Sequence, residues 1–346
     1  MQVTAGTRLA EHTTLRVGGP AAEIVVADDE ATLVAAVAEA DAAGVPALVI
    51  AGGSNLVIAD DGYAGRAVLV RTRGIAVEAD SCGGAWLTIA AGEPWDDVVA
   101  RAVGEEWAGV EALSGIPGSA GATPIQNVGA YGQEVAAVLA RVRTFDRAAG
   151  VQRTFASADC GFGYRTSRFK QEPGRWLVLD VTLQLRLSPI SGPLPYAELA
   201  HRLGVEPGAR ARLDAVREAV LELRRGKGMV LDADDHDTWS VGSFFTNPVL
   251  DPEAAADLPE GAPRFEQPDG RVKTSAAWLI DHAGIERGRS RGGAAVSTKH
   301  VLAITNRDDA SAANVVALAG DVRAAVEAAF GVHLEPEPVL VGLSLT

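Results

Sequence analysis

The sequence predicts an α+β protein built in two parts, and three observations support that expectation. A strand, a helix and a second strand follow one another between residues 23 and 50. Short β-prone runs dominate residues 67–91 and return at 142–145 and 176–185, which favours a mainly antiparallel sheet. A helical pattern at 213–225 is then broken by Gly226 and Gly228, so a domain boundary is expected there.

The first elements are defined by the residues at their ends. Residues 23–27 predict a strand, and Asp28 and Asp29 open an alanine-rich helix that Gly44 ends. Residues 46–50 predict the next strand, which completes a βαβ unit.

Four later helices are expected. Val98 and Val99 lie on one of them, and apolar residues recur at helical spacing at 213–225. Residues 275–283 predict a short helix, and Ser311 caps a longer one. The apolar stripe of that last helix indicates core packing and not a cofactor site: Leu318, Val322, Val326 and Phe330.

The bulk composition points to a globular protein without a nucleic-acid partner. The chain has 346 residues, 47% of them hydrophobic, which suits two domains with real cores. A net charge of −14 argues against binding to nucleic acid or an anionic membrane, so any anionic ligand must meet a local basic site. Two cysteines and the lack of a signal segment or long apolar run predict a cytoplasmic protein without disulfides.

Residues 115–132 form the most informative segment, and five of these eighteen residues are glycine. Glycine permits positive φ and lets a ligand lie directly on the backbone, while the prolines of this segment stiffen it. The spacing fits neither a P-loop nor a Rossmann turn. We expect an ordered ligand-binding loop, the alternative being a long Gly/Pro surface loop.

A shorter glycine turn, Ala-Gly-Gly-Ser-Asn-Leu, occupies residues 51–56 directly after the second strand. Its N–H groups can hold phosphate oxygens, although such a turn is also an ordinary connection. Residues 161–170 alternate aromatic and cationic side chains, which suits a flat anionic ligand or, alternatively, a solvated strand edge. Arg224, Arg225 and Lys227 lie near the expected boundary, where they can clamp a pyrophosphate.

Two further segments are candidates for proton chemistry. Ser243 lies between Gly242 and two phenylalanines, an environment that partly desolvates and fixes a proton-donating hydroxyl; a buried serine bonded to the backbone is the alternative. Glu335 and Glu337 stand two residues apart, so in an extended segment they share one face and can share a proton. Solvated glutamates are the alternative there. The six histidines show no ligand spacing, and we expect no catalytic metal.

Together these segments closely resemble the UDP-N-acetylenolpyruvoylglucosamine reductase family, also called UDP-N-acetylmuramate dehydrogenase. The resemblance runs in order through nearly the whole chain, and the ordered set is far more specific than any one run. The matching runs are His12-Thr13-Thr14-Leu15, residues 51–56, residues 115–132, Gly163-Tyr164-Arg165, residues 242–248, Trp278-Leu279-Ile280-Asp281 and Leu334-Glu335-Pro336-Glu337.

The resemblance implies an FAD-binding fold of the vanillyl-alcohol-oxidase (PCMH) type over residues 1–225, in subdomains of about 1–70 and 71–225 with FAD between them. A smaller α+β substrate-binding domain at 226–333 and a C-terminal strand at 334–346 are implied to follow. The cofactor-binding residues carried over are Gly52, Gly53, Ser54, Asn55, Leu56, Gly115, Ile116, Pro117, Gly118, Ser119, Gly121, Ala122, Gln126, Asn127 and Ala130.

The resemblance also implies a reaction. In this family NADPH reduces the flavin, leaves, and is replaced by an enolpyruvyl UDP-sugar, which becomes UDP-N-acetylmuramate for peptidoglycan. Negative charge develops at the α-carbon and its carboxylate, so a cation or acid is needed there, with a proton donor at the carbon. Arg165 and Glu337 match the charge-stabilising pair, with Glu337 preferred over Glu335, and Ser243 matches the proton donor.

Substrate contacts are implied at Tyr164, Lys227 and Asn247. Tyr196 lies in a segment that resembles the tyrosine loop of the family's longer subtype, which is expected to close as a lid. His282 stands where enzymes of that subtype can carry a substrate-contacting glutamine. A monomer is expected.

Two rival functions are also compatible with parts of this sequence. One is a flavin oxidase of the same fold that acts on an alcohol or sugar, and it would not need the Gly-Ser-Phe-Phe segment. The other is a nonenzymatic UDP-sugar or flavin sensor, which would not need a proton donor such as Ser243.

Overall fold

The computed structural model describes residues 2–4 and 7–345, which form two compact units. The first unit contains Met1–Gly6, Ala21–Gly52 and Ala64–Gly226, and the second contains Thr7–Pro20, Gly53–Tyr63 and Lys227–Thr346. The break at Gly226 lies one residue from the expected boundary. Two N-terminal segments, Thr7–Pro20 and Gly53–Tyr63, nevertheless belong to the second unit. This grouping differs from the contiguous domains expected from the sequence.

A four-stranded sheet opens the first unit, in the order β1 (Gln2–Thr4), β2 (Ala21–Ala27), β5 (Tyr63–Val70) and β3 (Ala47–Ile50). The helix α1 (Glu30–Ala42) joins β2 to β3, and its N-cap Asp29 accepts a hydrogen bond from the backbone N–H of Thr32. Gly44 follows the helix with φ +66°. The predicted strand, helix and strand are therefore confirmed, with β5 inserted between the two strands.

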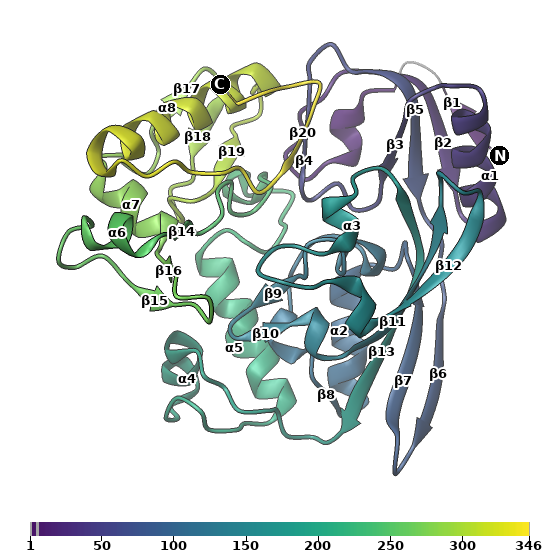
Figure 1. Cartoon of the computed structure of the whole chain (residues 1–346), viewed down its shortest axis with the longest axis horizontal. Helices are drawn as coiled ribbons and strands as arrows, with labels where there is room; N and C mark the ends of the chain where they lie inside the picture. The colour runs from purple at the N-terminus through teal and green to yellow at the C-terminus, as the bar shows by residue number, and fades with distance from the viewer. Residues whose placement is uncertain (1, 5–6, 346) are drawn as a thin grey trace. The chain divides into compact units, whose positions relative to one another are not determined.

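The larger sheet of the first unit is antiparallel throughout, as predicted. Its main strands run in the order β12 (Val151–Ala156), β11 (Leu139–Asp146), β13 (Trp176–Leu187), β7 (Gly84–Ala90) and β6 (Ile75–Asp80), side by side in Figure 1. The two-residue strand β8 (Trp107–Ala108) pairs with the end of β13.

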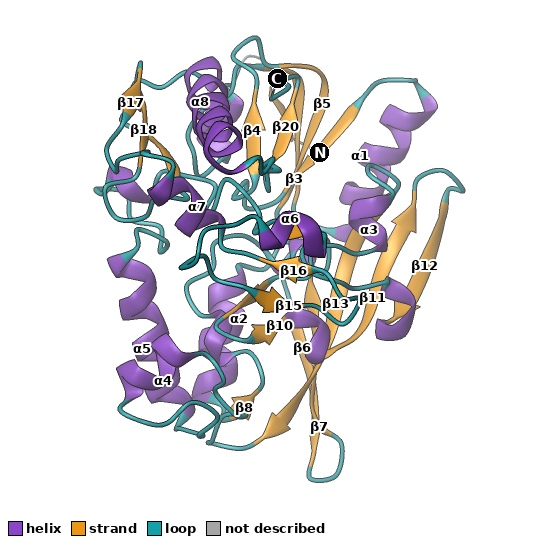
Figure 2. Ribbon diagram, turned by 60° about the vertical axis from the view of Figure 1, so that its left-hand side comes forward, coloured by secondary structure: helices purple, strands orange, loops and turns teal. Residues whose placement is uncertain are grey.

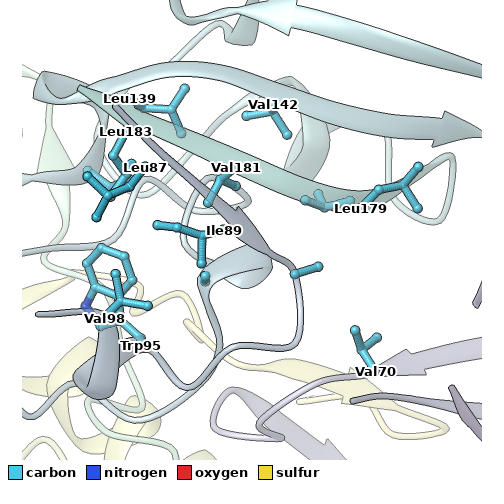
Figure 3. Packing of buried hydrophobic residues seen from close by; sticks show 14 of the residues in the cluster. Val70, Leu87, Ile89, Trp95, Val98, Leu139, Val142, Leu179, Val181 and Leu183 are labelled. Carbon is cyan, nitrogen blue, oxygen red and sulfur yellow. The ribbon is translucent and has the colours of Figure 1, made fainter. Parts of the chain in front are cut away.

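The helix α2 (Trp95–Gly104) packs against this sheet. Its buried residues Trp95, Val98, Val99 and Ala102 recur at i, i+3, i+4 and i+7, which places them on one face. Figure 3 shows Trp95 and Val98 beside Leu87, Ile89, Val181 and Leu183 of the sheet. The expected helix containing Val98 and Val99 is confirmed, and β8 and η2 (Glu111–Leu113) lie between its end at Gly104 and the glycine-rich segment.

Two further helices of the first unit pack together, α4 (Ala197–Leu203) and α5 (Leu213–Gly226), as Figure 2 shows. The buried residues Val216 and Val220 of α5 meet Leu199 of α4. The remaining elements are short: η2 (Glu111–Leu113), η3 (Ala120–Ala122), β9 (Gly129–Ala130), β10 (Gln133–Glu134), η4 (Val135–Ala137), η5 (Ser157–Cys160) and α3 (Arg168–Gln171).

The second unit combines small sheets with two packed helices. The parallel pair β4 (Leu56–Ile58) and β20 (Val339–Val341) joins chain segments far apart in sequence (Figure 2). The other elements are η1 (Leu9–His12), η6 (His236–Thr238), β14 (Val249–Leu250), α6 (Pro252–Ala256), β15 (Phe265–Glu266), β16 (Val272–Lys273), α7 (Ala276–His282), β17 (Ser290–Arg291), β18 (Ala294–Val296), β19 (Ile304–Asn306) and α8 (Ala312–Phe330).

The long helix α8 begins at the predicted N-cap, Ser311. Ser311 and Asn314 form a reciprocal capping box, and Gly331 ends the helix at φ +66°. Leu318, Val322 and Val326 are buried in the core of the second unit, where the N-terminal residues Leu15 and Val17 also lie. Among the described residues, no helix has both the length and the apolar character needed to cross a bilayer.

Candidate functional site

Backbone hydrogen bonds fix the glycine-rich segment 115–132 within the first unit. The N–H of Gly115 donates to Asp96 Oδ1 at 2.6 Å, the N–H of Trp95 donates to the carbonyl of Gly118 at 3.0 Å, and Gly121 donates to the carbonyl of Ala91 at 2.9 Å. Three anchors in seven residues make this an ordered loop. The structure therefore does not support the alternative, a loose surface loop.

Close backbone packing explains why glycines stand in this segment. A Cβ added at Gly52 would lie 2.5 Å from the Cα of Gly118, so the two predicted cofactor-binding runs meet here. A Cβ added at Gly121 would lie 2.5 Å from the Cβ of Ala91. Any larger residue would force these backbones apart.

Two polar groups beside this contact suit a phosphate. The hydroxyl of Ser119 is buried and has no hydrogen-bond partner within the part of the chain that the structure describes. Arg71 donates to the carbonyls of Ala51 and Val70, and burial, with repulsion from Arg73, lowers its pKa. A buried hydroxyl without a partner is costly, and a bound anion would relieve both that cost and the buried charge. The loop thus fits the pyrophosphate of a dinucleotide.

Three non-glycine residues near this loop adopt left-handed backbone conformations. Asn127, Tyr131 and Arg165 have φ of +47°, +49° and +51°. Such conformations cost about 1–3 kcal/mol each and persist where the surrounding structure enforces them. Their grouping indicates that this part of the first unit is constrained for a purpose other than stability.

The side chain of Asn127 joins the loop to the turn that carries Arg165. Its Nδ2 donates to Glu134 Oε2 at 2.8 Å and to the carbonyl of Gly163 at 3.2 Å, while its Oδ1 accepts from the N–H of Ala136 at 3.1 Å. Both the NH₂ group and the oxygen of the Asn127 amide are therefore hydrogen-bonded to other protein groups. Asn127 holds neighbouring backbone in place.

Arg165 lies in a tight turn closed by mutual backbone hydrogen bonds between Gly163 and Thr166. Its Nη2 donates to the carbonyl of Gly129 at 3.0 Å, and Lys170 Nζ donates to the carbonyl of Arg165 at 3.0 Å. The structure therefore brings Arg165 to β9 of the predicted cofactor loop. Tyr164, beside it in the turn, is exposed.

Two tyrosines from distant segments meet at the end of the loop. The rings of Tyr131 and Tyr196 are edge to face, with centroids 5.4 Å apart. Burial raises the pKa of Tyr131 to about 12, and burial also raises that of Tyr196. A Cβ at Gly132 would lie 2.8 Å from Cγ of Pro195, so the tyrosine loop packs directly on the glycine-rich segment.

Two more ionisable side chains complete this region: Asp96, which local sequence patterns do not reveal, and Arg224, which the sequence does indicate. Asp96 accepts two hydrogen bonds from Arg217, at 2.7 and 2.9 Å, in addition to that from Gly115. Burial opposes ionisation of Asp96, but these hydrogen bonds outweigh it and hold its pKa below the usual value. Burial lowers the pKa of Arg224 to about 10, and Tyr131 and Asp96 act against that decrease.

Within the second unit, backbone pairing places the segment that carries Ser243 beside the segment that carries Glu337. Phe245 pairs antiparallel with Pro336, and the N–H of Glu337 donates to the carbonyl of Phe244 at 2.8 Å. The side chain of Glu335 is 73% exposed, whereas Glu337 is half-buried. Burial thus agrees with the preference for Glu337 as the functional carboxyl group.

The second predicted glycine turn is divided between the units. Gly52 belongs to the first unit, and Gly53, Ser54, Asn55 and Leu56 belong to the second. Asn55 Nδ2 donates to the carbonyl of Glu337 at 3.3 Å, and the N–H of Val339 donates to the carbonyl of Asn55 at 2.9 Å. Asn55 therefore holds the strand that carries Glu337.

Three predicted substrate residues also lie in the second unit. Asn247 Oδ1 accepts from the N–H of Ala276 at 3.0 Å, which ties Asn247 to the start of α7. His282 stacks on Trp278 with ring centroids 3.8 Å apart and bonds to its carbonyl through Nδ1. Lys227 is the first residue after the unit boundary. No cluster of His, Cys, Asp or Glu suited to a metal occurs among residues 2–4 and 7–345.

Comparison with known proteins agrees with this arrangement. Residues 21–155 match the family model for an FAD binding domain. Together with the ordered glycine loop, this match defines the chain as a flavin-dependent oxidoreductase. Residues 234–341 match the model described as UDP-N-acetylenolpyruvoylglucosamine reductase, C-terminal domain. The chain belongs to the UDP-N-acetylenolpyruvoylglucosamine reductase family.

Relatives in this family are similar over almost the whole chain. A UDP-N-acetylenolpyruvoylglucosamine reductase of Cutibacterium acnes is 55% identical over 97% of this chain and 90% of its own length. One from Streptomyces coelicolor is 54% identical over the same shares. The crystal structure of the Thermus caldophilus enzyme superposes with a TM-score of 0.67 at 25% identity, covering 99% of both chains. The predicted FAD-binding fold, enzyme class and cofactors, FAD with NADPH, are confirmed.

Proposed function

We propose that this enzyme reduces the enolpyruvyl group of UDP-N-acetyl-3-O-(1-carboxyvinyl)-glucosamine to UDP-N-acetylmuramate, a peptidoglycan precursor. The names of its relatives and the family model over residues 234–341 support this substrate. FAD, once bound and reduced by NADPH, would supply the hydride that the terminal vinyl carbon accepts. The remaining requirements fall to side chains of the protein: a proton at the α-carbon and stabilisation of the charge on the adjacent carboxylate.

Ser243 is the proposed proton donor, and the bridge between Phe245 and Pro336 is the observation that carries this assignment. A hydroxyl is ordinarily a weak acid, but the α-carbon that accepts the proton is strongly basic. A short transfer in a fixed orientation is then sufficient. The flanking Phe244 and Phe245 are fully buried, so the backbone on one side of Ser243 is fixed.

Arg165 and Glu337 are proposed to stabilise the developing carboxylate charge. The guanidinium of Arg165 is already oriented by its hydrogen bond to Gly129. An oriented cation does not have to reorganise when charge appears, which is the main source of electrostatic catalysis. Glu337 is half-buried and can share a proton with the substrate carboxylate.

The cofactor contacts are proposed from the same geometry. Gly52, Gly118 and the Ser119 hydroxyl would hold the FAD pyrophosphate, because they offer close backbone approach and a buried donor. The contacts with the UDP-sugar are proposed from the resemblance, at Tyr164, Tyr196, Lys227, Asn247 and His282. Tyr196 is 45% exposed and its ring packs on Tyr131. We propose that the loop carrying Tyr196 closes over the bound nucleotide.

We further propose a monomer that works in the cytoplasm. The net charge of −14 supports the absence of a nucleic-acid or anionic-membrane partner. Both cysteines are free, Cys82 exposed and Cys160 buried, which suits a reducing compartment. Neither rival function is favoured: an oxidase or a sensor has no need for the paired Ser243 and Glu337 segments.

Replacing Ser243 tests the proposed function directly. In Ser243→Ala, anaerobic NADPH should bleach the flavin at the normal rate, while reoxidation by the enolpyruvyl UDP-sugar should slow by about 10²- to 10⁴-fold. Stopped-flow absorbance measures both half-reactions. The control is Ser290→Ala, because Ser290 is an exposed serine of the same unit. Unchanged reoxidation in the Ser243 variant would remove the proton-donor assignment.

A further inference from the structure

The N-terminal run His12-Thr13-Thr14-Leu15 has no role in the reaction described above, yet it is buried in the second unit. Thr13 and Thr14 are only 7% and 8% exposed, and Leu15 is fully buried. Leu15 and Val17 belong to the same apolar cluster as Phe244 and Phe245. The start of the chain is therefore packed into the core that supports Ser243.

Thr14 makes a short hydrogen bond across most of the sequence. Its Oγ1 donates to the carbonyl of Ser240 at 2.6 Å, although the two residues are 226 positions apart. Its backbone N–H donates to the carbonyl of Gly53 at 3.2 Å. A Cβ at Gly53 would lie only 1.9 Å from the carbonyl oxygen of His12, so this junction admits no side chain at Gly53. The backbone of Thr14 is thus fixed by Gly53, and its side chain in turn fixes the carbonyl of Ser240.

The backbone between Ser240 and Phe244 is fixed at both ends. Ser240 Oγ accepts from the N–H of Gly242 at 3.1 Å, and Ser240 pairs with Thr305 in an isolated bridge. Phe244 donates its N–H to the carbonyl of Leu302 at 2.8 Å. Gly242 adopts φ +74°, which turns the chain immediately before Ser243. The position of the Ser243 hydroxyl therefore depends on where the carbonyl of Ser240 is held.

The adjacent N-terminal residues strengthen the same attachment. Asn306 Nδ2 donates to the carbonyls of Leu15 and Arg16 at 3.2 Å, and its N–H donates to the carbonyl of Trp239 at 3.0 Å. The guanidinium of Arg16 lies 3.6 Å from the centroid of the Trp239 ring. Trp239 directly precedes Ser240, so these contacts act on the same short segment. Thr14 supplies its most direct side-chain anchor.

We propose that Thr14 is a positioning residue for Ser243, acting through the carbonyl of Ser240. The inference rests on the proposed role of Ser243 as proton donor. A hydroxyl that must deliver a proton to one carbon tolerates little displacement, because a shift near 1 Å can lower the rate by about 10²-fold. Thr14 does not touch the substrate in this proposal. It sets the geometry of the residue that does.

The test compares two adjacent threonines. Thr14→Val keeps the size of the side chain but removes its donor. Thr13→Val is the matched control, because within the described residues the Thr13 hydroxyl bonds to the nearby carbonyls of Ala10 and Val17. In Thr14→Val, reoxidation of the reduced flavin by the enolpyruvyl UDP-sugar should slow by about 10- to 100-fold. Reduction by NADPH should keep its normal rate, and Thr14→Ser should restore reoxidation. Equal reoxidation rates in the two valine variants would overturn the proposal.

A double-variant comparison separates positioning from general damage. If Thr14 acts through Ser243, adding Thr14→Val to Ser243→Ala should slow reoxidation no further. Full additivity of the two effects would overturn the positioning role. Slow reoxidation in Thr14→Val beside normal reoxidation in Ser243→Ala would overturn the proton-donor assignment and the positioning role together. Slow reoxidation in Ser243→Ala beside a normal Thr14→Val would overturn the positioning role alone.

A second readout guards against a folding defect. Slower proton transfer should raise the solvent deuterium isotope effect on reoxidation in Thr14→Val, whereas lost stability would alter both half-reactions and FAD retention alike. If Thr14→Val yields little folded protein, Thr14→Cys offers a weaker donor and should give an intermediate reoxidation rate. A cysteine variant with the rate of the unmodified enzyme in both half-reactions would contradict the proposal.

Discussion

At the scale of single residues, the two glutamates near the C-terminus show how burial separates groups that look equivalent in the sequence. Glu335 and Glu337 flank one proline, and either fits the expected extended segment. Glu335 lies largely in solvent and approaches His333 at 3.9 Å. Glu337 is half-buried, with its backbone held by Phe244 and Asn55. The backbone of Glu335 is held too, through the N–H of Thr246, so burial of the side chain is what distinguishes Glu337 from Glu335.

This difference gives a paired prediction. Glu337→Gln should slow reoxidation of the reduced flavin by substrate about 100-fold or more. The glutamine amide cannot share a proton with the substrate carboxylate as the Glu337 carboxyl group is proposed to do. Glu335→Gln removes the same charge from an exposed position and should leave both half-reactions unchanged. Stopped-flow rates for the two variants, measured side by side, decide between them. A slow Glu335 variant with a normal Glu337 variant would reverse the assignment.

Asp96 gives a prediction about pH. Because the folded-state pKa of Asp96 is lowered, its ionised form stabilises the fold above the usual value of 3.8, and that stability is lost as pH falls through the folded-state pKa. Asp96→Asn should therefore lower the free energy of unfolding by about 1 kcal/mol at neutral pH, since the carboxylate is partly exposed. The deficit should shrink below pH of about 4.

Urea unfolding at pH 7 and pH 3 measures this difference. Asp97→Asn is the control, because Asp97 is the exposed neighbour of Asp96 on α2. A deficit of equal size at both pH values would show that the charge of Asp96 does not stabilise the loop. FAD affinity should also decrease in Asp96→Asn, because Gly115 loses a charged acceptor.

At the scale of elements, the close contact between Gly52 and Gly118 brings the turn after β3 against the glycine-rich loop. Gly52→Ala should weaken FAD binding by about 10- to 100-fold, because overpacking displaces one backbone from the other. Gly104→Ala is the control, since a Cβ there meets nothing within 4 Å. Titration of apoprotein with FAD measures both affinities. Equal affinity in the two variants would mean that FAD does not need this contact.

The elements also show what sequence patterns can predict. Asp29, Ser275 and Ser311 were expected to start helices, and each side chain accepts a hydrogen bond from a backbone N–H within three residues. Capping is local, so it is visible in the sequence. The short helices α3 and α6 and the two-residue strands were not predicted, because they hold too few residues to show a period.

The candidate site was predictable only where its residues form contiguous runs. The loop 115–132 and the Ser243 segment were identified by their own composition. The pairing of Asp96 with Arg217, 121 residues away, leaves no local pattern, and the same holds for Thr14 and Ser240. Tertiary hydrogen bonds of this kind join residues that are far apart in the sequence, so no local pattern predicts them. The roles of Asp96, Arg71 and Thr14 therefore leave no signal in the local sequence.

At the scale of the whole molecule, neither unit is a single continuous stretch of the sequence. The second unit takes Thr7–Pro20 and Gly53–Tyr63 from the N-terminal part of the chain. These segments supply buried Leu15, Val17 and Val57 to its core, and β4 to its parallel pair. The family model over residues 234–341 therefore spans only part of what folds together.

A fragment experiment follows from this composition. The isolated segment Lys227–Thr346 should not fold cooperatively, because its core lacks three buried apolar residues and β20 lacks its partner. Circular dichroism and urea titration of the fragment, with the full chain as control, measure this. A single steep unfolding transition in the fragment would show that the N-terminal segments are dispensable for its fold.

The parallel pairing of β4 with β20 has a consequence for synthesis of the enzyme. Residues 56–58 emerge from the ribosome some 280 positions before the strand they bind, so the β4 edge stays uncovered until residues 339–341 have been made. An uncovered edge invites association with other chains. The same late residues bring Glu337 into place. A prematurely terminated product would therefore carry an open strand edge and lack Glu337, the carboxyl group proposed to act in the reaction.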